Sequence, residues 1–528
     1  MRPVFAAFLV FLCNSALFAQ LPQYELELSD RHRIATSPDG VKLLYSNADE
    51  LCLLKSIQTS DAIERPWMLA WYSQDGFHKM DSLVFDLREQ GRKCDVDQLI
   101  KINNRFILIY SLVTDHHRKI TVFARELDPS QRRLTGESKK ILEFESDQRR
   151  RVRAGRMNFT LSPDNTKIFF MRGFSHDGRN REVALFAALD TTLRERWKKV
   201  VTLPYPVGMM TVKNLKLSND GDAFALILVK TANQVNLTFD LLMVRQHGTS
   251  VVRYSVQSKT GFVSSAQIEI NGIGKLLCTG FYSKAGGEAA SGVFFNIIET
   301  ETLQHSETVS DFDTKLVLRD LHPADIATVR SKAELDLAAE LNQFHADHIL
   351  PRPDGGFVLI GEQRYDYSTT ARQGASFSRG GVYRNYRNLY QPSRFYRGDL
   401  LAVKVNAHGA IEWENKIHKA QDTNDHRTIY ASYMVLNIGG KLRLLFNEDR
   451  RNITGFALRK EKVFGGSSPV IAIVTLDDEG KSVRELIYDS VGWPMVMSPE
   501  MSAQVSDHEL LLYGYKHFHE QISMIRFK

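Results

Sequence analysis

The sequence of 528 residues predicts an all-β protein, and two observations support this prediction. Short apolar runs alternate with tight-turn signals, as expected for strands joined in hairpins. One turn type also recurs before apolar strands. In it, proline fixes the first turn dihedral, aspartate bonds to its own backbone, and glycine or asparagine accepts the positive φ that follows. The turn reads SPDG at 37–40, SPDN at 162–165, SNDG at 218–221 and RPDGG at 352–356.

A second repeated unit lies downstream of these turns. It consists of an apolar strand, a polar turn and a strand that often carries tryptophan or another large apolar residue, and it occurs at 184–201, 241–256, 400–417 and 470–487. The two units share one period, because Asp164 to Asp220 and Asp190 to Gln246 are both steps of 56 residues. Four short antiparallel strands that repeat at this spacing are typical of the blades of a β-propeller.

The repeats predict a single β-propeller of eight four-stranded blades, which start near residues 31, 95, 156, 211, 263, 344, 430 and 500. Seven blades are the alternative, because the first blade is irregular around LCLLKS. The chain ends at Lys528 before the last blade has a fourth strand. We expect YELELS at 24–29 to supply that strand, which would close the ring and remove its open edges.

The first 19 residues have the layout of a cleavable secretory signal, with Arg2, an apolar run from Pro3 to Leu12 and small residues before Gln20. We therefore expect residues 20–528 to form one exported domain that is periplasmic, outer-membrane-associated or secreted. No later apolar run is long enough to predict a transmembrane segment. The formal net charge of +6 is small for a chain of this length, so a preference for anions must come from local clusters of basic residues.

Two insertions interrupt the repeat. Residues 313–343 lie between blades 5 and 6, and the apolar spacing after Pro323 predicts a short helix around 323–343. Residues 363–398 form the loop between the second and third strands of blade 6. This loop contains seven arginines, six tyrosines and one acidic residue, Asp366. Loops of this length are usually functional or disordered.

The blade 6 insertion and the arginine-rich crossing RRRVRAGR at 149–156 are expected on one face of the disc, because both follow strands that run in the same direction. Arginine binds carboxylates, phosphates and sulfates in a bidentate manner, and tyrosine provides rigid contact area. A solvated insert without a specific ligand is the alternative. The candidate binding residues are Arg379, Tyr383, Arg384, Tyr386, Arg387, Arg394, Tyr396, Arg149, Arg150 and Arg151.

These patterns favour an exported, non-catalytic binding or assembly module for an acidic protein or an anionic glycan. Nucleic acid is not an expected partner of a protein with an export signal. We expect no metal or cofactor, because HADH at 345–348 and HFHE at 517–520 each supply too few convergent ligands. The alternative is a carbohydrate-active hydrolase or lyase, for which Glu362 and Asp399, on either side of the insertion, are the candidate carboxylate pair.

The repeats carry a resemblance to known proteins. SPDGVKLLY, SPDNTKIFF and SNDGDAFAL resemble the hairpin repeat of TolB-type β-propellers, and GDLLAVKVNAHGAIEWENKI is similar to blades of large secreted propellers of Gram-negative bacteria. The resemblance implies an architecture and leaves the function unassigned, because the same repeats serve many functions.

Overall fold

The structure is a computed structural model dominated by β-strands. It describes residues 24–34, 38–57, 67–114, 119–145, 150–152, 157–176, 181–206, 208–230, 237–245, 248–271, 275–299, 305–318, 340–367, 394–424, 428–453, 463–465, 469–489, 495–516 and 518–528.

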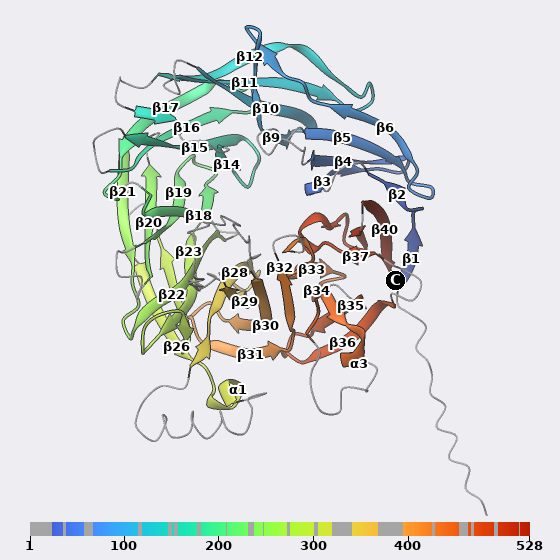
Figure 1. Ribbon diagram of the computed structural model, residues 1–528. Helices are drawn as coiled ribbons and strands as arrows, with labels where there is room; N and C mark the ends of the chain where they lie inside the picture. The colour runs from blue at the N-terminus through green and yellow to red at the C-terminus, as the bar shows by residue number, and fades with distance from the viewer. Residues whose placement is uncertain are drawn as a thin grey trace, which may run out of the picture.

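Eight antiparallel sheets stand in a ring, which confirms the predicted eight-bladed propeller (Figure 1). In each blade the first strand lies nearest the centre of the ring and the fourth lies at the rim. The first four blades are β3(Pro38–Ser46)-β4(Glu50–Ile57)-β5(Trp67–Ser73)-β6(Lys79–Val84), β9(Asp95–Ile102)-β10(Arg105–Thr114)-β11(Lys119–Asp128)-β12(Arg133–Glu145), β14(Asn158–Leu161)-β15(Lys167–His176)-β16(Val183–Asp190)-β17(Glu195–Thr202) and β18(Met210–Leu217)-β19(Ala223–Val229)-β20(Thr238–Arg245)-β21(Ser250–Val256).

Blades 5 to 7 follow the same order. They are β22(Phe262–Ile270)-β23(Leu276–Ser283)-β25(Gly292–Ile298)-β26(His305–Asp311), β28(Phe344–Pro351)-β29(Phe357–Tyr367)-β30(Arg394–Val405)-β31(Ile411–Ile417) and β33(Met434–Ile438)-β34(Lys441–Asp449)-β35(Pro469–Leu476)-β36(Ser482–Asp489).

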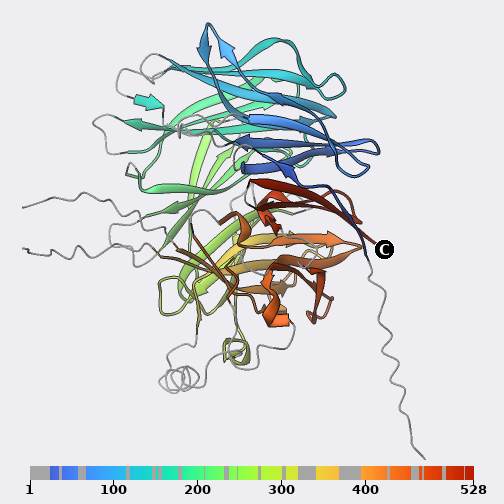
Figure 2. The ribbon, with the colours of Figure 1, turned by 45° about the vertical axis from the view of Figure 1, so that its right-hand side comes forward.

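The last blade joins the two ends of the described chain. Its inner strands are the short β37(Val496–Met497) and β38(Ala503–Gln504), followed by β39(Glu509–Lys516) and β40(His519–Phe527). Its outer strand is β1(Tyr24–Leu28), which pairs antiparallel with β40 from Tyr24↔Phe527 to Leu28↔Ser523. The expected closure of the ring by the N-terminal strand is confirmed. Figure 2 shows the blue N-terminal strand beside the red C-terminal strands.

The core is divided among the blade interfaces. Eight buried apolar clusters are present in the described part of the chain, and each joins two neighbouring blades; the cluster between blades 8 and 1 also includes Tyr430 and Phe464 from segments of blade 7. Blades 2 and 3, for example, meet through Ile109 and Phe170, and blades 8 and 1 meet through Tyr513 and Tyr72. Because no blade buries both of its faces alone, the ring is stabilised as one body.

Turn chemistry behaves largely as the sequence indicated. The repeated turns place Asn165 at φ 55°, Gly221 at φ 93° and Gly355 at φ 84°. The turn of blade 1 differs, because Gly40 lies within β3 and has no positive φ. The hairpin corner predicted at SPDG is therefore wrong for blade 1, where residues of this segment pair with β4 instead.

Tryptophan in the outer strands has a packing role. A Cβ added to Gly248 would lie 2.6 Å from the ring of Trp197, and one added to Gly480 would lie 2.5 Å from the ring of Trp413. Both glycines also have positive φ, +83° and +80°. Each tryptophan of an outer strand therefore packs on a bare turn of the next blade, which explains why the turn and the tryptophan recur together.

The insertion before blade 6 is described only at its ends. The short helix α1(Thr314–Leu318) follows β26, and β27(Leu341–Asn342) precedes β28. Most of the helix predicted around 323–343 lies outside the described residues. No helix in the described part of the protein is long and apolar enough to cross a membrane.

Candidate functional site

The two strands that flank the blade 6 insertion continue further than the sequence suggested. β29 runs to Tyr367 and β30 begins at Arg394, so the segment expected as a loop from 363 to 398 is a paired ribbon at both ends. A third strand, β32(Gln421–Asn424), pairs with the other edge of β30. We call residues 363–367, 394–398 and 421–424 the pedestal. The predicted loop boundaries were too wide because tyrosine, phenylalanine and arginine alternate here in a way that suits paired strands.

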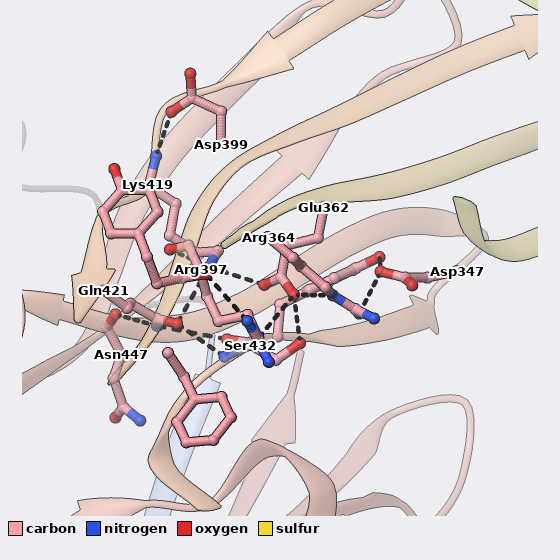
Figure 3. A network of polar contacts seen from close by, with 12 residues as sticks. Asp347, Glu362, Arg364, Arg397, Asp399, Lys419, Gln421, Ser432 and Asn447 are labelled. Carbon is pink, nitrogen blue, oxygen red and sulfur yellow. Dashed lines mark hydrogen bonds and ion pairs between the residues drawn. The ribbon is translucent and has the colours of Figure 1, made fainter. Parts of the chain in front are cut away.

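The pedestal has two different faces. Arg364 pairs with Arg397 and Tyr365 pairs with Tyr396, so strand alternation places the arginines on one face and the tyrosines on the other. The two tyrosine rings lie 5.6 Å apart between centroids. The arginine face is directed into a charged cluster, which includes Glu362 just before the pedestal (Figure 3).

Glu362 is the centre of this cluster and its side chain is fully buried. The Lys419 ammonium lies 2.9 Å from Oε1, Arg364 Nε donates to Oε2 at 2.8 Å, and the Ser432 hydroxyl donates to Oε2 at 3.1 Å. Burial opposes ionisation, but Lys419 and Arg364 outweigh it and lower the pKa of the Glu362 carboxyl. The carboxylate is therefore ionised and shared between two cations.

Asp347 extends the cluster to the innermost strand of blade 6. Arg364 Nη2 donates to Asp347 Oδ2 at 2.8 Å, and the hydroxyl of Tyr433, which precedes β33 of blade 7, donates to the same oxygen at 3.1 Å. Burial raises the pKa of the Asp347 carboxyl to about 7; Arg364 opposes the rise and Glu362 adds to it. Arg364 thus bridges two carboxylates that differ in protonation behaviour.

Lys419 carries the network toward blade 7. Its buried ammonium also donates to the backbone carbonyl of Arg397 at 3.0 Å and to Gln421 Oε1 at 3.1 Å. The Gln421 amide donates to the carbonyl of Asn447 at 2.8 Å, and the Asn447 amide donates to the carbonyl of Met497 in blade 8 at 2.7 Å. The base of the insertion is therefore held by three consecutive blades.

Asp399 belongs to a neighbouring polar group. Its Oδ1 lies 2.8 Å from His418 Nδ1 and accepts the backbone N–H of Lys419 at 3.2 Å, and Lys416 lies 4.0 Å from Oδ2. Burial acts to raise the pKa of the Asp399 carboxyl, but the contact with His418 and the other partners outweigh this effect, so the pKa is lowered.

Glu362 and Asp399, the carboxylate pair suggested for glycoside hydrolysis, do not meet the requirement for a general acid. A general acid needs a raised pKa so that it holds a proton at neutral pH. Glu362 and Asp399 both have lowered pKa values and both are held in ion pairs. Their arrangement suits a rigid support better than proton transfer to a leaving group.

Only some of the predicted binding residues can be placed. Arg394 is largely exposed at the start of β30, where its Nε donates to Asp422 Oδ1 at 3.2 Å, and Tyr396 stands two residues further along the strand. Arg150 and Arg151 lie in the strand β13(Arg150–Val152), which pairs with β15. The remaining candidates, Arg379, Tyr383, Arg384, Tyr386, Arg387 and Arg149, lie outside the described residues.

The motifs considered for metals have other partners. Glu520, the acid of HFHE, is bound by Lys55 at 2.7 Å across the closure of blades 8 and 1. A β-bulge separates Ala346 from His348 in HADH, which disturbs the alternation that a two-residue ligand spacing needs. Within the described ranges, no group of three or more His, Cys, Asp or Glu side chains is placed to hold a metal ion.

Sequence reasoning missed the charged cluster. Glu362 was considered as a candidate acid and Asp347 as part of HADH, but nothing in the sequence linked them to each other or to Lys419 and Ser432, which lie in separate segments. The signal present in the sequence was the placement of charged residues at the ends of apolar strands, as in VLIGEQR and NKIHKAQD. Such residues usually indicate a solvated strand end, so this signal alone does not predict a buried ion cluster.

No protein-family model and no curated protein matches this chain. Among solved structures, the WD40 domain of SCAP from fission yeast is 9% identical with a TM-score of 0.39, and the match covers 96% of this chain and 95% of that chain. The β-propeller domain of the Trilobed protease from Pyrococcus furiosus is 9% identical with a TM-score of 0.31, covering 86% and 97%. Polysaccharide lyase Uly1 is 9% identical with a TM-score of 0.35, covering 84% and 94%. At these identities no activity or ligand is transferred.

Proposed function

We propose that this protein is an exported, non-catalytic binding or assembly module built on TolB-like propeller repeats. It engages an acidic protein or an anionic glycan of the cell envelope through the face that carries the blade 6 insertion. The contact residues are Arg379, Tyr383, Arg384, Tyr386, Arg387, Arg394 and Tyr396, with Arg149, Arg150 and Arg151 from the crossing before blade 3.

The observation that supports this proposal most strongly is the construction of the pedestal. Its arginine face is neutralised inside the protein by Glu362 and Asp347, while Arg394 remains largely exposed. The insertion that it supports, residues 368–393, contains four arginines and no acid. A strongly cationic segment fixed at both ends to a three-stranded support can present bidentate donors to an anionic partner at a low entropic cost.

The structure suggests a clean deletion. Tyr367 and Arg394 are direct cross-strand partners, so residues 368–393 can be replaced by Asn-Gly, a turn that closes two-residue hairpins. We expect this variant to keep the melting temperature of the parent and to lose partner capture from an envelope extract. Binding to immobilised dextran sulfate, an anionic glycan without uronic acids, and to polyglutamate distinguishes a glycan partner from an acidic protein.

Two further variants separate charge from geometry. Serine at Tyr383, Arg384, Tyr386, Arg387, Arg394 and Tyr396 should abolish capture. Lysine at Arg384, Arg387 and Arg394 keeps the charge but removes the planar fork, so it should weaken capture without abolishing it. Retained capture by the deletion and the serine variant would reject the proposal.

A further inference from the structure

A groove of about 600 Å³ lies between blades 6 and 7 on the face opposite the insertion. It is bordered by the turn between the first two strands of each blade and by the turn between the last two strands of blade 7. The insertion leaves blade 6 from the other ends of these strands. The groove is therefore separate from the surface discussed above, and its volume falls in the range of pockets that hold small ligands.

The floor of the groove is apolar. Leu350, Val358, Leu442 and Leu476 line it, and Trp413 forms part of its outer wall. The indole N–H of Trp413 donates to the carbonyl of Asp478 at 2.9 Å, which fixes the orientation of the ring. A ligand that fits this groove therefore needs one apolar face that packs against these side chains.

The rim of the groove carries cationic side chains on its inner side and an acidic side chain on its outer side. Arg352 and Lys441 stand on the turns nearer the centre of the ring, and Asp478 stands on the outer turn of blade 7. Arg352 Nη2 lies 3.7 Å from Asp478 Oδ1 across the groove, and its Nε lies 3.3 Å from Asp354. Lys441 is exposed, and no described residue forms an ion pair or hydrogen bond with its ammonium.

We propose that this groove binds a short oligosaccharide of uronic acid sugars. The apolar face of a pyranose ring packs on the leucine and valine floor, the ring carboxylate binds Lys441 and Arg352, and hydroxyl groups donate to Asp478 and accept from the exposed amide of Asn437. A sugar acid has this combination, because it carries one anionic group and many hydroxyls that both donate and accept. A polyglutamate peptide suits the site less well, because it carries the same repeated carboxylates but no hydroxyl groups to donate to Asp478.

Calorimetric titration with trigalacturonate tests the proposal, and a neutral trisaccharide of galactose serves as the probe for charge. Lys441→Ala should weaken trigalacturonate binding about tenfold, because it removes a charge-assisted contact to the carboxylate, and it should leave neutral sugar binding unchanged. Lys481→Ala is the matched control. Lys481 is an exposed cation of the same face that pairs with Glu479 and does not line the groove. This control should bind like the parent protein.

Shape is tested separately from charge. Asn437→Trp places a large ring at the exposed rim of the groove without changing the charge, and it should abolish binding of trigalacturonate. The deletion of residues 368–393 should leave this binding intact, since the insertion lies on the other face. Absence of saturable binding, equal losses in Lys441→Ala and Lys481→Ala, tighter binding of triglutamate, or loss of binding in the insertion deletion would each overturn the assignment.

Discussion

Replacing Glu362 by glutamine should destabilise the protein strongly, although the two side chains have the same shape. The substitution leaves the Lys419 ammonium fully buried without its counter-charge at 2.9 Å and removes the charge from the Arg364 contact at 2.8 Å. Breaking a buried ion pair by removing one partner typically costs about 3–5 kcal/mol. The double variant Glu362→Gln/Lys419→Met removes both charges and should recover part of that free energy.

The cost of Glu362→Gln should depend on pH in a defined direction. The folded protein lowers the pKa of Glu362, so the folded state binds fewer protons there than the unfolded chain does. The stabilisation is therefore present above the unfolded pKa, about 4.3, and is lost as the pH falls through the folded value. The difference in unfolding midpoint between parent and variant should be full at pH 7 and should shrink in strongly acidic buffer.

Urea unfolding followed by tryptophan fluorescence provides the assay, with the midpoint compared at constant slope. Glu479→Gln is the matched control, because Glu479 pairs with Lys481 in an exposed position where an ion pair contributes little. A Glu362→Gln variant as stable as the Glu479→Gln variant at pH 7 would refute the reasoning, because it would mean that the buried cluster is not ionised.

Other consequences concern packing, protonation and closure. Gly248→Ala should destabilise the protein more than Gly208→Ala, because both positions have φ near +82° but only the first would press a methyl group into Trp197. The contact should add about 1–3 kcal/mol to the loss of unfolding free energy measured in urea. Equal losses of stability in the two variants would contradict this prediction. Asp347→Asn should become relatively more stabilising from pH 5 to pH 8, because a carboxyl with a folded pKa of about 7 costs the folded state most when it is ionised; a melting-temperature difference independent of pH would contradict it. Removing strand β1 should expose the edge of β40 and lower the melting temperature, with aggregation as a second readout; an unchanged, monomeric protein would contradict the closure.

The sequence by itself determined the architecture. The Pro-Asp turns and the turn-tryptophan unit act over a few residues, and their common period of 56 residues set the blade size before any contact was known. The closing strand at 24–29 was also predictable, because a propeller whose last blade lacks a strand has few other segments that can complete it. Local turn chemistry and strand alternation are sufficient for such statements.

The tertiary structure decided where charge is buried. Glu362 was noticed in the sequence as a possible acid, yet its partners Lys419 and Ser432 lie 57 and 70 residues further along the chain. Their contact depends on the packing of blade 6 against blade 7. The limits of the insertion were decided in the same way, because β29 and β30 pair with each other as far as Tyr367 and Arg394, and β32 pairs with the other edge of β30. Sequence patterns record short-range conformational preference, whereas the free energy of a buried ion depends on which distant groups surround it.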